Sequence, residues 1–284
     1  MNRPVILLQT DFSLTWGAAA SMKGVIKCTD PALEIQDLCH DIKKFDPWEA
    51  SLSLNACEPY WPQGTVIVSV VDPGVGTERK ACAALLNDGT YVITPYNGTL
   101  THLKHSPGIR EVRQISPGIR FRGKEEVSVF HGRDIFAYCA ALLASGKITY
   151  EQIGPAYDPS EVTECEEYYM NPVVRADSAE CFIMTGLVHF GGIQFNILNA
   201  DWRKTDFREG SYVHVRIMHS GQQVFGRDVM YAPGFGYVKI SEPVLYCGSS
   251  GYLSLDCNQD SFMERFGIGT GKQWTAVLSR AEQQ

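Results

Sequence analysis

Short apolar segments separated by polar turns recur through the first half of the chain. Three of them, at residues 5–8, 34–38 and 66–71, are too short to be free-standing helices and predict buried strands of a parallel sheet. Between them, residues 18–26 and 47–56 have helix-compatible compositions, and the second segment begins with a proline, which the first turn of a helix accommodates. This alternation predicts an α/β domain with a central, mostly parallel sheet.

The remainder of this domain adds a hairpin and more helix. Two apolar segments flank Asn87-Asp88-Gly89, which is a strong hairpin signal. A later amphipathic segment ends at Gly146, a residue type that commonly follows the last turn of a helix. We therefore predict hairpin strands at 82–86 and 91–94, the start of a helix at 99–103, a short strand at 127–130 and a helix at 135–144.

The second half of the chain changes to alternating segments punctuated by glycine. No helical period is sustained before a short segment at 261–266, so the region predicts an all-β, barrel-like domain. A stretch rich in Pro, Glu and Tyr precedes it and predicts a linker. We place the α/β domain at residues 1–160, the linker at 161–171 and the β domain at 172–284. The predicted strands of the β domain are 180–188, 212–218, 236–240 and 252–255.

Length, charge and cysteine content narrow the class of protein. A chain of 284 residues with 44% hydrophobic residues suits two domains with sizeable cores. Its 25 basic and 32 acidic residues give a net charge of −7 without a run of Lys or Arg, which argues against a nucleic-acid partner. No apolar segment has the length of a membrane span or a signal peptide, and nine cysteines without C-x-x-C spacing favour reduced thiols. These features predict a cytoplasmic protein without a membrane partner.

Polar side chains stand where three of the predicted strands end. Asp11, Asp72 and His131 each follow one strand, and a turn containing a proline and two glycines brings Arg79 back toward Asp72. Because the carboxyl ends of strands in an open α/β sheet form ligand sites, these groups are candidates for a reaction centre. A carboxylate or an imidazole can take a proton from water, and a nearby cation favours hydroxide. The same residues also fit an ordinary aspartate turn capped by an arginine and a half-buried histidine, and the pattern leaves both interpretations open.

Other reaction classes lack their sequence signatures. The seven histidines show no H-E-x-x-H or comparable spacing with carboxylates, so no metal site is predicted. Residues 267–272 resemble a phosphate loop only in their glycines, because Gln273 stands where Ser or Thr would follow the lysine. A G-x-S-x-G nucleophile motif is absent. We predict neither a metal nor a cofactor.

Six short motifs, taken in order, resemble the S-adenosylmethionine (SAM) hydroxide adenosyltransferases, relatives of fluorinases and chlorinases. The resemblance covers nearly the whole chain. It implies an N-terminal α/β domain, a C-terminal barrel-like domain, and a homotrimer whose active sites lie between one subunit's first domain and a neighbour's second. The motifs are Thr10-Asp11-Phe12, the segment 22–26, the turn from Asp72 to Arg79, Asn97-Gly98 followed by Leu100, the segment 130–136 and the segment 249–253.

The resemblance implies chemistry for the strand-end residues. Water-using members of the family carry an Asp, Arg and His set that Asp72, Arg79 and His131 match, whereas halogenating members replace the Asp and the His. The implied reaction is attack of water on C5′ of SAM, which releases methionine and adenosine. A sulfonium leaves as a neutral thioether, so catalysis reduces to positioning the water and the carbon. The implied substrate-binding residues are Asp11 at the ribose hydroxyls, Trp48, Phe130 and Gly132 in the nucleoside pocket, and Phe190, Asn196, Tyr231, Ser249 and Ser250 from the second domain.

The sequence departs from the family pattern where the methionine tail is expected. Trp16 and Val188 stand where acids are usual, and Gly192 stands where an asparagine is usual. Loss of the acids would leave the ammonium of the tail without charged partners. Either a different 5′-substituted adenosine with a more apolar tail is hydrolysed, or groups such as His189 and Ser249 hold methionine instead. The pattern also leaves open a non-catalytic adenosine- or SAM-binding protein and, as a less favoured reading, a halide adenosyltransferase.

Overall fold

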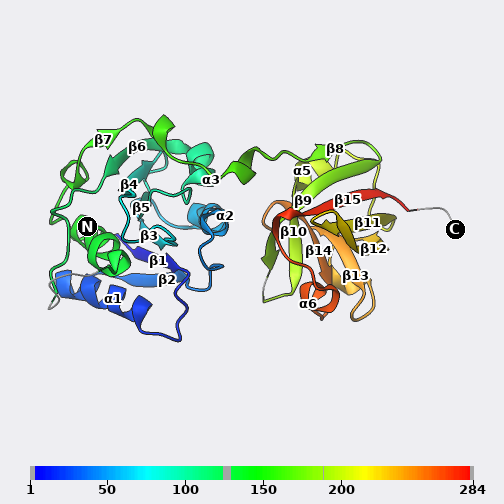
Figure 1. Cartoon of the computed structure of the whole chain (residues 1–284), viewed down its shortest axis with the longest axis horizontal. Coiled ribbons are helices and arrows are strands. Elements are labelled where there is room, and N and C mark those ends of the chain that lie inside the picture. Colours follow the sequence, from blue (N-terminus) through cyan, green and yellow to red (C-terminus); the bar gives the residue numbers. More distant parts are fainter. Residues whose placement is uncertain (1–3, 124–128, 188, 282–284) are drawn as a thin grey trace. The chain divides into compact units, whose positions relative to one another are not determined.

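The chain forms two compact units, Met1–Tyr168 and Tyr169–Gln284. The computed structural model describes residues 4–123, 129–187 and 189–281 (Figure 1). The division between the units falls within the predicted linker at 161–171. An N-terminal α/β unit followed by a β-barrel unit confirms the predicted fold class.

A seven-stranded sheet forms the centre of the first unit, in the order β2-β1-β3-β5-β4-β6-β7. The first four strands of this order pair in parallel, and β4, β6 and β7 extend the sheet through antiparallel pairs. Apolar, β-branched sequences form the buried middle strands, as expected for a sheet covered on both faces. The strands are β1 (Ile6–Thr10), β2 (Ile35–Cys39), β3 (Val66–Val70), β4 (Ala81–Leu86), β5 (Tyr91–Pro95), β6 (Ile109–Gln114) and β7 (Ala156–Tyr157).

Helices cover the two faces of this sheet. On one face, Met22 and Ile26 of α1 pack with Leu8 of β1, while on the other Leu54 of α2 packs with Leu7. Neighbouring residues of β1 thus serve opposite cores, and each fully buried side chain of this size contributes about 1.5–3 kcal/mol. The helices are α1 (Ala18–Thr29), α2 (Pro47–Cys57), α3 (Thr101–Leu103) and α4 (Tyr138–Ala144), with π-helical segments at Lys104–Gly108 and Gly132–Ala137 and 3₁₀ turns at Glu58–Tyr60, Glu151–Ile153, Pro159–Glu161 and Glu166–Tyr169.

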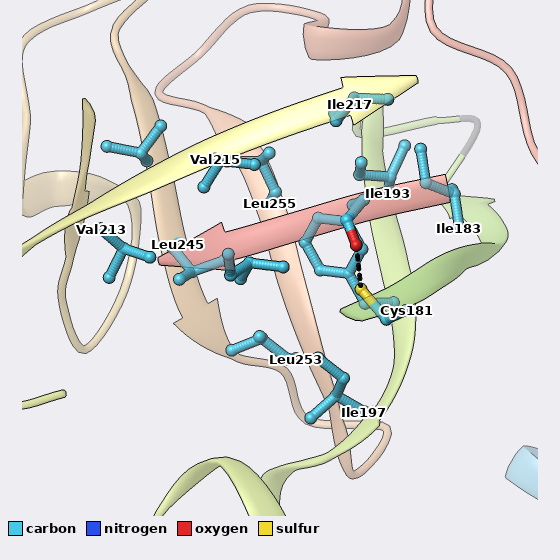
Figure 2. Close-up of a cluster of buried hydrophobic side chains, with 14 of the residues drawn as sticks. Cys181, Ile183, Ile193, Ile197, Val213, Val215, Ile217, Leu245, Leu253 and Leu255 are labelled. Carbon is cyan, nitrogen blue, oxygen red and sulfur yellow. Dashed lines mark hydrogen bonds between the residues drawn. The ribbon is translucent and has the colours of Figure 1, made fainter. Parts of the chain in front are cut away.

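The second unit is a closed barrel of seven strands. Pairing follows the order β10-β14-β13-β12-β11-β15-β9, β9 pairs back onto β10, and β8 extends β9. Alternate side chains such as Val213, Val215 and Ile217 point inward with Leu253 and Leu255 and fill the interior (Figure 2). The elements are β8 (Val173–Val174), β9 (Ser178–Leu187), β10 (Gly192–Leu198), α5 (Asn199–Trp202), β11 (Tyr212–His219), β12 (Gln222–Tyr231), a 3₁₀ turn (Phe235–Tyr237), β13 (Pro243–Cys247), β14 (Tyr252–Cys257), α6 (Phe262–Phe266) and β15 (Gly271–Arg280).

Several predicted elements differ from the structure. The predicted strand at 236–240 is wrong, because this segment lies in a 3₁₀ turn and the irregular loop before β13. Of the predicted strand at 127–130, the first two residues lie outside the described part of the chain, and Val129 and Phe130 are not in a strand. No predicted strand corresponds to β6, β7, β8, β10, β12, β13 or β15.

Candidate active site

The carboxyl ends of β1 and β3 place two acidic side chains at one edge of the sheet. Thr10 of β1 aligns with Val70 of β3 in parallel register; Asp11 follows β1 directly, and Asp72 stands two residues after Val70. The loop after β5 reinforces this edge, since the Asn97 side chain donates a hydrogen bond of 2.7 Å to the carbonyl of Val71. The end of β3 is therefore held in place just before Asp72.

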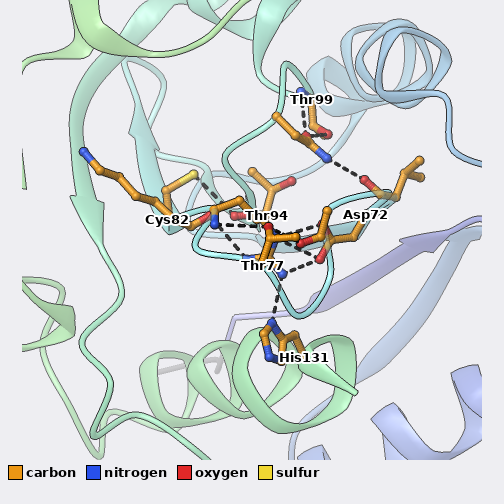
Figure 3. Close-up of polar contacts among 11 residues, drawn as sticks. Asp72, Thr77, Cys82, Thr94, Thr99 and His131 are labelled. Carbon is orange, nitrogen blue, oxygen red and sulfur yellow. Dashed lines mark hydrogen bonds and ion pairs between the residues drawn. The ribbon is translucent and has the colours of Figure 1, made fainter. Parts of the chain in front are cut away.

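A compact turn folds Arg79 back onto Asp72 (Figure 3). Gly76 supplies a φ of +81°, and the Thr77 hydroxyl donates to the Gly74 carbonyl at 2.7 Å. Arg79 Nε lies 2.8 Å from Oδ1 and 3.0 Å from Oδ2 of Asp72, and Nη2 also donates to Oδ2. The two side chains are only 5% and 11% exposed, so water screens this charge pair little.

The same guanidinium also contacts His131. Arg79 Nη2 donates to Nδ1 of His131 at 3.1 Å, so the ring accepts at Nδ1 and, when neutral, carries its proton on Nε2 (Figure 3). Burial lowers the pKa of His131 first, and the positive charges of Arg79 and Arg120 lower it further, against the opposing effect of Asp72 and Asp134. The imidazole therefore favours its neutral form.

Close packing fixes the segment that carries His131. Gly132 is buried, and a Cβ at this position would lie 2.9 Å from the Phe130 ring and 3.3 Å from a methyl of Val70. The Phe130 ring in turn packs edge-on against Phe12, with their centroids 5.6 Å apart. Only a glycine lets this segment approach the ends of β1 and β3 so closely, and this approach brings His131 to Arg79.

Two other first-unit residues predicted to bind substrate, Asp11 and Trp48, already have partners within the protein. Asp11 Oδ2 accepts a hydrogen bond of 2.9 Å from the backbone N–H of Phe45. Trp48 is buried near the start of α2, with its ring centroid 4.6 Å from that of His102. This packing gives Trp48 a structural role, and its contact with a nucleoside stays a prediction.

A hollow of about 610 Å³ lies beside the segment that carries His131. Trp16, which is 80% exposed, forms part of its wall. Arg133 forms another part, and its guanidinium donates to buried Asp134 at 2.6 Å and lies over the Phe130 ring. The lining residues are Thr15, Trp16, Gly17, Ala18, Ser21, Phe130 and Arg133. Sequence reasoning assigned no role to Thr15, Ser21 or Arg133, although Arg133 stands two residues after His131 within the family motif at 130–136.

The second-unit residues predicted to bind substrate fall into two groups. Phe190 is 72% exposed in the turn between β9 and β10, and Ser249 and Ser250 are exposed between β13 and β14. By contrast, Tyr231 is buried inside the barrel, and Asn196 accepts from the Phe182 N–H at 2.9 Å and donates to the Met170 carbonyl at 2.7 Å. Tyr231 and Asn196 thus already serve the barrel itself, and their contact with substrate stays a prediction.

The residues that depart from the family pattern are placed differently. Trp16 lines the hollow in the first unit. Val188 lies outside the described residues. Gly192 begins β10, and a Cβ there would lie 2.0 Å from the carboxylate of Asp256, so this glycine makes room for a buried acid.

Two further findings concern metals and membranes. Across residues 4–123, 129–187 and 189–281, no group of three or more His, Cys, Asp or Glu side chains is arranged to hold a metal ion. In the same part of the chain, no helix combines the length and apolar character that a membrane crossing requires.

Comparison with known proteins identifies the family. Models of the SAM hydroxide adenosyltransferase N-terminal and C-terminal domains match residues 6–154 and 189–275. An (R)-S-adenosyl-L-methionine hydrolase of Thermus thermophilus is 34% identical over 95% of this chain and 97% of its own length. A fluorinase of Nocardia brasiliensis is 26% identical over 95% of each chain. The crystal structure of an uncharacterized conserved protein from Thermotoga maritima superposes with a TM-score of 0.84 at 28% identity, covering 96% of this chain and 100% of that one. The chain therefore belongs to the SAM hydroxide adenosyltransferase family.

Proposed function

We propose that the protein hydrolyses SAM to adenosine and L-methionine. Family membership and the relatives named (R)-S-adenosyl-L-methionine hydrolase support this activity. The observation that carries the proposal is the position of Arg79, which contacts both Asp72 and His131 at the carboxyl edge of the sheet. Three polar groups held together there suit the binding of one water molecule.

The proposed reaction is a direct displacement at carbon. A lone pair of the water oxygen forms the C5′–O bond while the C5′–S bond breaks, and its electron pair stays on sulfur as the neutral thioether of methionine. The water loses one proton to the Asp72 carboxylate, which passes it to solvent. No acid has to assist the leaving group, so the protein contributes orientation and electrostatic stabilisation.

Asp72, Arg79 and His131, here called the triad, each have a separate proposed role. Neutral His131, with Nδ1 occupied by Arg79, donates its Nε2–H to the water oxygen and orients it. Arg79 fixes Asp72 and His131 and stabilises negative charge as the proton leaves. Asp72 acts as the proton acceptor, a contribution worth roughly 10²- to 10⁴-fold in rate. Beside the triad, we propose that Asp11 binds the ribose hydroxyls and that Phe130 and Phe190 contact the nucleoside.

We also propose that the enzyme is a homotrimer whose sites are completed by a neighbouring subunit. Large apolar side chains are exposed at the carboxyl edge of the first unit, including Leu14, Trp16 and Phe45, and others are exposed on the barrel, including Tyr237 and Ile240. Apolar surface of this kind is typical of regions covered in an assembly. Light scattering coupled to size-exclusion chromatography should give three times the mass of the 31.6 kDa chain, and a monomer would contradict the proposal.

The cysteines support a reducing compartment. All nine are free thiols, and Cys82, Cys139, Cys181 and Cys257 are buried. We therefore propose a cytoplasmic location, where thiols stay reduced.

Product analysis tests the proposed activity. The protein is incubated with SAM, and adenosine and methionine are quantified by chromatography beside the Asp72→Asn variant. We expect equal amounts of the two products from the parent and very little from the variant. Binding of SAM without adenosine would instead favour a non-catalytic binding protein, and 5′-chloro- or 5′-fluoroadenosine in the presence of halide would favour a halide transferase.

A further inference from the structure

The hollow beside the His131 segment lacks the acidic lining residues that would bind the ammonium of a substrate with an amino-acid tail. None of its seven lining residues, all of which the structure describes, is acidic. The ionisable side chain among them is the guanidinium of Arg133. The first turn of α1, which forms another part of the wall, also carries no acid. An ammonium group entering this hollow would therefore meet no carboxylate among these lining residues, and the Arg133 guanidinium there is already paired with Asp134.

The two hydroxyl groups in the wall already have hydrogen-bond partners within the protein. Ser21 already donates to the carbonyl of Ala18 at 2.8 Å, and the Thr15 hydroxyl lies 2.7 Å from that of Ser13. The indole of Trp16 is 80% exposed and is available to a ligand. An indole packs on methylene groups and attracts a sulfonium to its face, but it gives no charged hydrogen bond to an ammonium.

The location of the hollow links it to the reacting carbon. Phe130 and Arg133 belong to its wall and flank His131 in sequence, so the hollow lies beside the segment that carries His131. In the proposed displacement, the sulfonium points away from the water, and its substituents must extend into neighbouring space. A volume of about 610 Å³ is ample for a chain of four carbons.

We propose that this hollow accepts the sulfonium tail through packing on Trp16 and does not recognise the ammonium of the tail. The substrate class is then adenosyl sulfoniums with an unbranched tail, of which SAM is one member. This inference rests on the proposed hydrolysis of SAM and adds which part of the substrate is recognised.

A comparison of three substrates tests the inference. They are SAM, its 2-oxo-acid analogue, in which a keto group replaces the amine, and the dimethylsulfonium analogue of adenosine, which has no tail. We expect SAM and the 2-oxo-acid analogue to differ by less than about threefold in kcat/KM, because no charged contact is lost. A loss of about tenfold or more with the 2-oxo-acid analogue would overturn the inference, since this is the effect of removing a hydrogen bond to a charged group.

Variants of Trp16 test the role of the indole. Trp16→Ala should lower kcat/KM for the two tailed substrates about tenfold relative to the tail-less sulfonium, because packing on two methylenes is lost. Trp16→Phe should restore most of this ratio, and Trp16→Asp should raise the preference for SAM over its 2-oxo-acid analogue. Tyr60→Ala removes another exposed aromatic side chain of the first unit. It should leave the ratios of kcat/KM among the three substrates unchanged. Equal effects of Trp16→Ala on tailed and tail-less substrates would contradict the inference.

Failure of the proposed function gives a different result. If no sulfonium yields adenosine, the hydrolase proposal fails, and calorimetric binding of the same compounds still decides the inference. Equal affinities for SAM and the 2-oxo-acid analogue would support it, and a preference of about tenfold or more for SAM would refute it.

Discussion

Two clusters of ionisable groups lie at opposite edges of the same sheet, and they balance charge in different ways. At the carboxyl edge, the Asp72 carboxylate is paired with the guanidinium of Arg79. At the amino edge, where β5 begins beside the start of β3, Glu58 is 2% exposed and hydrogen-bonds to the carboxyl of Asp88. Burial, followed by the neighbouring Asp88, raises the pKa of Glu58 to about 7. One edge therefore holds a pair of opposite charges, and the other holds a glutamate that favours its protonated form.

The difference indicates what each edge can do. A guanidinium cannot lose its proton at any ordinary pH, so Arg79 stays charged and holds Asp72 in a fixed geometry for a water molecule. The Glu58–Asp88 pair, with the Thr90 hydroxyl donating to Glu58 at 3.1 Å, is favoured when Glu58 is protonated. We therefore expect catalysis to depend on the first cluster and the pH dependence of stability to depend on the second.

The largest effect is expected for Asp72→Asn. The amide keeps the shape of the carboxylate but cannot accept a proton, so kcat for adenosine formation should fall by roughly 10²- to 10⁴-fold. Glu58→Gln is the matched control at the opposite edge and should keep kcat within about twofold, because it lies far from the triad in the sheet. SAM binding to Asp72→Asn, measured by calorimetry, shows whether the variant retains its fold. Comparable losses in both variants would remove the functional distinction between the two clusters.

The next effect concerns His131 and pH. Its pKa is lowered from the ordinary value of 6.5, so the neutral ring that accepts from Arg79 persists to more acidic pH. The parent kcat/KM should fall about tenfold per pH unit only below this lowered pKa. His131→Asn keeps a hydrogen-bond donor but does not titrate, so it should be slower and lack this acidic limb. The same limb in the variant would assign it to another group.

The sequence predicted this site more completely than it predicted the surrounding elements. The convergence of Asp11 and Asp72 follows from the rule that parallel strands end at one edge, and the structure has Thr10 aligned with Val70. His131 was placed after a strand, yet Phe130 is not in one; packing around Gly132 brings the histidine to Arg79. Such packing joins residues that are far apart in the chain and leaves no local pattern.

Several barrel strands could not be predicted from the sequence for a related reason. In β12 the buried residues are Phe225, Val229 and Tyr231, and the exposed Arg227 between the first two interrupts the hydrophobic alternation on that face. In β15 only Ala276 and Leu278 are buried among ten residues. Strands of this kind are stabilised by their neighbours in the closed barrel, and hydrophobic alternation alone underestimates them.

A smaller effect, on stability, is expected for Glu58→Gln. A folded-state pKa of about 7 against an ordinary 4.5 means that the folded protein binds the proton more tightly than the unfolded chain. This contribution is fully present below 4.5 and is lost as pH rises through about 7, with a size of at most about 3 kcal/mol. The glutamine mimics the protonated acid, so the variant should lose less stability than the parent between about pH 5 and 9 in urea unfolding. Parallel pH profiles for parent and variant would show that Glu58 does not titrate in this range.

The smallest effect is expected for Asp88→Asn, which separates the two causes of the raised Glu58 pKa. Burial is the larger cause and remains in the variant, whereas the carboxylate of Asp88, which also raises the pKa, is removed. The pH range in which the parent loses stability should therefore move to lower pH without reaching the ordinary glutamate value. Urea unfolding as a function of pH measures this shift, and Asp41→Asn, an exposed aspartate of the same unit, is the matched control. A shift all the way to the ordinary value would mean that Asp88 rather than burial keeps the proton on Glu58, and no shift would mean that the two carboxyls do not interact.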